Sequence, residues 1–77
     1  MAQEIKQHQQ HVIINIRELR EQKGLSQRFM GSALGLSQHA YSKIEQGYSK
    51  ITVPQLFIIS EALNVDVNIL LANKTAG

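Results

Sequence analysis

The chain has 77 residues, of which 43% are hydrophobic and 18% are charged. This composition is typical of one small globular domain and excludes a disordered chain. The absence of cysteine excludes disulfides and cysteine-based metal sites. A net charge of +2 permits an anionic partner without requiring one. The apolar runs are too short to cross a bilayer, and the polar first residues lack a signal-peptide core, so we expect a cytoplasmic protein.

The first part of the chain is rich in Gln and His and then becomes helical in pattern. Residues 1–11 are predicted to form a frayed tail or an extra helical turn, and we treat them as a flexible tail. From residue 13 to residue 23, apolar side chains recur at helical spacing, and Gly24 suits a left-handed C-terminal cap. We therefore predict one domain over residues 12–72, followed by a C-terminal tail over residues 73–77.

Two short helices follow, and each has a serine in front of it. Ser26 is a suitable N-cap for a helix over residues 27–34, and Ser37 for a helix over residues 38–46. Gly35 separates the two helices. The pair therefore forms a helix-turn-helix pattern, in which the turn contains a glycine.

The remaining helices have equally local signals. Thr52 and Gln55 form a capping box in front of a helix over residues 53–63. Asn64 is suited to a left-handed cap, and Asp66 begins a short helix that ends near Ala72. No segment alternates with a period of two, so the predicted fold class is all-α with five short helices.

The third predicted helix has two different faces. Its inner face is apolar, through Ala40, Tyr41 and Ile44. Its outer face is polar, through Gln38, His39, Ser42 and Lys43. Gly31 in the preceding helix leaves room for a close helix crossing. Such a polar helix fits the DNA major groove, where base edges present a complete donor and acceptor code.

Residues 13–71 resemble the Cro/phage-repressor (XRE) family of helix-turn-helix proteins. The resemblance rests on the stretch IRELREQKGLSQRFMGSALGLSQHAYSKIEQG and continues through ITVPQLFIISEALNVDVNILL. The motif LSQ…LGLSQ…IEQG is far more specific than a lone two-helix pattern. The resemblance implies a compact five-helix lambda-repressor-like domain that binds double-stranded DNA.

The resemblance also implies site residues. The expected base-reading positions are Gln38, His39, Ser42 and Lys43. We expect contacts to the DNA backbone from Gln27, Arg28, Ser37, Tyr48, Ser49 and Lys50, where Ser37 and Arg28 are added because helix N-termini attract phosphate. Arg20 and Glu45 are expected to form a structural ion pair that fixes the recognition helix. Each proposed DNA contact has a plainer alternative as a solvated side chain, a helix cap or a polar loop.

Four positions depart from the family pattern. Met30 stands where Leu is usual, Gly31 where Ala is usual, Phe29 where a polar residue is usual, and Asn64 where Gly is usual. None of these changes removes a DNA-facing group. They therefore put the stability of the domain in question and leave its function in place.

Surplus apolar residues near the C-terminus suggest a partner surface. The fourth helix is expected to bury Val53, Leu56, Ile59 and Leu63, and the fifth to bury Leu70 and Leu71 at most partly. The side chains left outside define an expected dimer interface of Ile58, Val65, Val67 and Ile69. The alternative is scattered exposed apolar residues, which are common. A homodimer could read a pseudo-palindrome with half-sites about one helical turn apart.

The leading hypothesis is a homodimeric, sequence-specific transcriptional regulator or repressor, associated with the nucleoid when bound to DNA. The rival hypotheses are an antitoxin that represses its own operon and a protein-binding adaptor. No catalytic motif is present, so we expect no enzyme, cofactor or small-molecule ligand. His8 and His11 share a helix face but have no third ligand nearby, so we expect no metal site.

Overall fold

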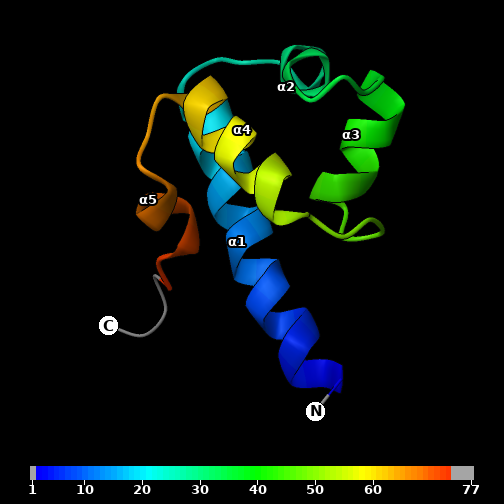
Figure 1. Cartoon of the computed structure of the whole chain (residues 1–77), viewed down its shortest axis with the longest axis vertical. Helices are drawn as coiled ribbons and strands as arrows, with labels where there is room; N and C mark the ends of the chain where they lie inside the picture. The colour runs from blue at the N-terminus through cyan, green and yellow to red at the C-terminus, as the bar shows by residue number, and fades with distance from the viewer. Residues whose placement is uncertain (1, 74–77) are drawn as a thin grey trace.

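The computed structural model of the chain describes residues 2–73, with side chains from Gln10 onward. This part of the chain contains five helices and no strand, so the all-α prediction is confirmed. In chain order the helices are α1 (Ala2–Gln22), α2 (Gln27–Ala33), α3 (Gln38–Glu45), α4 (Val53–Leu63) and α5 (Val67–Leu71). Figure 1 shows α4 and α5 against the second half of α1, with α2 and α3 together at one edge of the molecule. None of the described helices is both long and apolar enough to cross a membrane.

Helix α1 is longer than the sequence pattern predicted. It begins at Ala2, whereas a tail was expected over residues 1–11. Residues 2–10 are mostly Ala, Gln, Glu and Lys, which have high helix propensity but give no apolar stripe. An amphipathic pattern therefore could not reveal this half of the helix. Most of the expected C-terminal tail, residues 74–77, lies outside the described residues.

The predicted helix ends are present in the structure. The side chains of Ser26, Ser37 and Asp66 each accept a hydrogen bond from a backbone N–H in the first turn that follows. Thr52 and Gln55 form the predicted capping box. These caps satisfy N–H groups that have no partner within the helix, and they define where four of the five helices begin.

One core joins all five helices. Seven fully or almost fully buried side chains form it: Ile16, Met30, Tyr41, Ile44, Ile59, Leu63 and Leu70. Two predictions about this core were wrong, because Leu70 is completely buried and Val53 is 67% exposed. Helix α4 is apolar around most of its circumference, so residue spacing could not show which face is buried. Helix α5 has only five residues, too few to show a period.

Polar side chains of α1 hold the end of α5. The Asn15 Nδ2 group donates hydrogen bonds to the carbonyl oxygens of Leu70, at 2.9 Å, and Ala72, at 2.7 Å. His11 Nε2 lies 3.0 Å from the carbonyl oxygen of Leu71. The last carbonyl groups of a helix lack partners within it. These contacts therefore cap α5 and fix it against the middle of α1.

Candidate nucleic-acid interface

Helices α2 and α3 cross closely at Gly31. A Cβ atom at this position would lie 2.9 Å from the Leu36 carbonyl oxygen and 3.0 Å from that of Ser37. The Leu36 N–H also donates to the Gly31 carbonyl oxygen at 2.8 Å. Between the helices, Gly35 has a φ of +72°, which only glycine adopts without cost. The two glycines thus set the distance and the turn of the helix-turn-helix pair.

The structure separates the two faces of α3. Tyr41 and Ile44 are buried in the core. On the outer face, Gln38, His39 and Lys43 are exposed. Ser42 is half-buried, and its hydroxyl accepts a hydrogen bond from Gln46 Nε2 at 3.0 Å. Three of the four expected base-reading side chains are therefore accessible, and the fourth already has a partner.

A buried carboxylate anchors the end of α3. Glu45 accepts a hydrogen bond from Arg20 Nε at 2.7 Å through Oε2, and one from Arg20 Nη2 at 3.1 Å through Oε1. The Tyr41 hydroxyl donates to Oε2 at 2.6 Å, and Gln27 Nε2 donates to Oε1 at 3.1 Å. Side chains of α1, α2 and α3 thus meet at one carboxylate. We call these four residues the Glu45 network.

The electrostatics of the Glu45 network favour its charged form. Burial alone would raise the pKa of the Glu45 carboxyl, but hydrogen bonds from Arg20, Tyr41 and Gln27 outweigh it and hold the pKa below its usual value. The hydrogen bond to Glu45 raises the pKa of Arg20. Burial, together with the hydrogen bond to the carboxylate, raises the pKa of Tyr41. The ion pair is therefore fully charged at neutral pH.

The expected backbone-contact residues lie on both sides of α3. Arg28 at the start of α2 is exposed, whereas Gln27 is half-buried because its amide bonds to Glu45. A Gln amide has two N–H donors, so one remains available. In the loop after α3, Tyr48 is 79% exposed and Lys50 is exposed, while Ser49 is half-buried. Ser37 caps α3 through its hydroxyl.

The loop after α3 is tied to the outer face of that helix. The backbone N–H groups of Tyr48 and Ser49 both donate to the Lys43 carbonyl oxygen, at 2.9 Å and 3.3 Å. The loop therefore continues the outer face of α3 at its C-terminal end. No group of three His, Asp or Glu side chains among the described residues could hold a metal ion. His8 lies outside the residues whose side chains are described.

The apolar surface on α4 and α5 differs in part from the expected one. Ile69 is 48% exposed, but Ile58, Val65 and Val67 are only half-buried, and Val65 packs against the core. The structure adds Phe57, which is 53% exposed, and Leu71. Residue spacing missed both because α4 and α5 have apolar residues on several faces.

Sequence reasoning also missed the polar role of Tyr41, which was expected only as part of the apolar inner face. The available signal was its position four residues before Glu45, which places both side chains on the same side of a helix. A buried tyrosine hydroxyl generally needs a partner. These two rules together could have identified the Tyr41–Glu45 hydrogen bond.

A family model described as helix-turn-helix matches residues 16–70, which cover α2 to α5 and the second part of α1. The chain therefore belongs to the XRE-type helix-turn-helix family of DNA-binding domains, and its fold is lambda-repressor-like. No curated protein and no solved structure matches the chain significantly.

Proposed function

We propose that the protein is a homodimeric, sequence-specific transcriptional regulator whose helix α3 enters the DNA major groove. The observation that carries the proposal is the outer face of α3. It presents Gln38, His39 and Lys43 to solvent with no acidic side chain among them. The Glu45 network holds the opposite side of the helix rigidly. A rigid, polar and partly cationic helix suits the reading of base edges.

Base reading and backbone contact have separate residues in this proposal. Gln38 offers the donor and acceptor pair that adenine needs, and Lys43 offers donors for guanine or a phosphate. The remaining base-reading positions are His39 and Ser42, the latter after its hydrogen bond with Gln46 is exchanged. Backbone phosphates are held by Gln27, Arg28, Ser37, Tyr48, Ser49 and Lys50. Phosphate contacts set the register, and base contacts set the sequence.

The exposed apolar side chains of α4 and α5 support a homodimer. Phe57, Ile69 and Leu71 are each about half exposed, and burial of such side chains drives association. The interface consists of these residues with the half-buried Ile58, Val65 and Val67 at its edge. A two-fold axis through this surface gives two α3 helices that face one operator.

Repression is the simplest outcome, because a dimer on an operator excludes other proteins from it. A second candidate is an antitoxin whose toxin binds the same apolar surface while the domain represses its own operon. An adaptor without DNA binding is less consistent with the cationic Lys43 on α3. The controllers of restriction–modification systems, Cro-like repressors and chromosomal regulators fit the proposal equally.

The experiment compares Lys43→Ala with Lys23→Ala, in which an exposed lysine at the end of α1 is changed instead. Affinity is measured for a duplex selected from a random library and for an unrelated duplex. We expect Lys43→Ala to weaken binding to the selected duplex by about 1–3 kcal/mol, the usual size of a specific contact. The thermal midpoint should stay within about 2 °C, since surface substitutions change stability little. Equal affinities of the two variants, or a melted Lys43→Ala domain, would contradict the proposal.

A further inference from the structure

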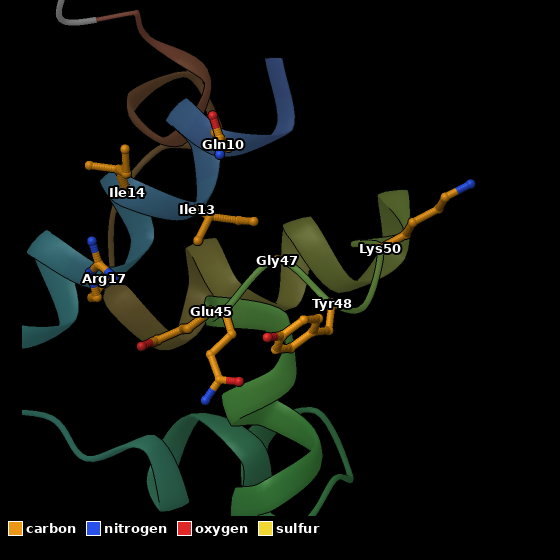
Figure 2. Close-up of a pocket in the computed structure, with 9 residues that line it drawn as sticks. Gln10, Ile13, Ile14, Arg17, Glu45, Gly47, Tyr48 and Lys50 are labelled. Carbon is orange, nitrogen blue, oxygen red and sulfur yellow. The ribbon is translucent and has the colours of Figure 1, made fainter. Parts of the chain in front are cut away.

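A groove of about 910 Å³ lies between α1 and the loop that follows α3. Figure 2 shows Gln10, Ile14 and Arg17 along one wall, with Glu45, Tyr48 and Lys50 on the other side. Ile14 is exposed in the groove although it is a large apolar side chain. Neither the base-reading helix nor the apolar surface of α4 and α5 accounts for this groove.

The groove is electropositive. Arg17 and Lys50 are exposed, and no ion pair or hydrogen bond of their side chains is recorded among the described residues. The one carboxylate in its lining belongs to Glu45, which is buried and already accepts four hydrogen bonds. Two cations without a counter-charge leave the groove complementary to an anion.

The groove is also continuous with the proposed DNA-binding surface. Its loop wall contains Tyr48 and Lys50, and the Tyr48 N–H is bonded to the Lys43 carbonyl of α3. A DNA strand whose bases meet α3 therefore passes this loop next. On α1, Gln10 and Arg17 are seven residues apart, which places both on one face two turns from each other. The apolar Ile14 between them can cover the carbon atoms of a sugar.

We propose that this groove receives the sugar-phosphate backbone of the bound DNA, with Arg17 of α1 binding a phosphate from the side opposite Lys50. The inference rests on the proposed function and extends its backbone contacts to α1. Arg17 reads no sequence, because a phosphate contact is the same at every base pair. It fixes the depth at which α3 sits in the major groove.

The test compares Arg17→Gln with Lys23→Gln, because both variants remove one exposed cation from α1 but only Arg17 lines the groove. Affinity for the selected and the unrelated duplex is measured across a series of salt concentrations. For Arg17→Gln we expect the slope of log affinity against log salt to become less steep by about 0.9, the value for one phosphate contact. The loss of affinity should be similar for both duplexes, and Lys23→Gln should keep the original slope.

Two results would overturn the inference. One is an unchanged slope for Arg17→Gln, which would leave the groove to a different anion. The other is the same change of slope in both variants, which would indicate net charge alone. The proposed function is judged separately by the unchanged protein. If that protein does not prefer the selected duplex, the proposed function fails; if it does and Arg17→Gln has no effect on the slope, only the inference fails.

Discussion

At the scale of single residues, the Glu45 carboxylate shows how the fold positions α3. Each of its oxygens accepts two hydrogen bonds, and its donors come from three helices. Its side chain is 3% exposed. A buried charge of this kind is tolerated only when it is fully paired, and loss of one partner is costly. The network therefore fixes the orientation of α3 relative to α1 and α2.

Tyr41→Phe removes only one hydroxyl from the Glu45 network. At neutral pH we expect the free energy of unfolding to fall by about 1.5–3 kcal/mol, the usual contribution of a hydrogen bond to a charged group. Because the folded-state pKa of Glu45 is lowered, its stabilisation is present above the unfolded pKa of about 4.3 and is lost as the pH falls through the folded value. The difference between the two proteins should therefore shrink in acid. Urea denaturation followed by circular dichroism over a pH series measures it.

The alkaline side gives an independent part of this prediction. The folded-state pKa of Tyr41 is raised, so its stabilisation is present below the unfolded pKa of about 10 and is lost as the pH rises beyond that value. Tyr41→Phe should lack this alkaline loss. Tyr48→Phe is the matched control, because Tyr48 is exposed and has no bond to Glu45 in the structure. A Tyr41→Phe difference that stays constant from acid to alkali would show that the hydroxyl does not meet the carboxylate.

At the scale of helices, the crossing of α2 and α3 depends on Gly31. Intrinsic propensity favours Ala over Gly inside a helix by about 0.5–1 kcal/mol. In this protein the added Cβ would press against two backbone carbonyl oxygens, which cannot move without shifting α3. The glycine that departs from the family pattern is therefore a requirement of this close crossing.

We predict that Gly31→Ala lowers the free energy of unfolding by about 1–3 kcal/mol, the usual cost of overpacking. Ser32→Ala, at the next and exposed position of α2, should change it by less than about 0.5 kcal/mol. Thermal unfolding of both variants measures the difference. A higher thermal midpoint for Gly31→Ala would mean that the helices are farther apart than the structure places them.

Much of the fold could be predicted from the sequence, because helix ends depend on neighbouring residues. Ser26, Ser37 and Thr52 each predicted the helix that follows, and the αL conformation of Asn64 was also predicted. The buried faces of α4 and α5 could not be predicted, since they depend on contacts with distant helices. At the candidate site, the polar face of α3 was visible in the sequence. The Tyr41 hydrogen bond and the groove beside Arg17 appear only when the helices are packed together.

At the scale of the whole molecule, one α3 helix is too short to define an operator. A single recognition helix contacts only a few base pairs, whereas two helices related by a two-fold axis read two half-sites. The apolar side chains of Phe57, Ile69 and Leu71 lie on α4 and α5, and α3 lies at another edge of the fold (Figure 1). A dimer through α4 and α5 would thus leave both α3 helices accessible.

Selection of bound duplexes from a random DNA library, read by sequencing, tests the central claim most directly. The account predicts an enriched pseudo-palindrome whose half-sites lie about 10–10.5 base pairs apart, or a multiple of that spacing. Ile69→Glu, which places a charge in the proposed interface, should enrich single half-sites or nothing. A library that shows no enrichment with the unchanged protein would contradict sequence-specific DNA binding. It would favour a protein partner for this domain.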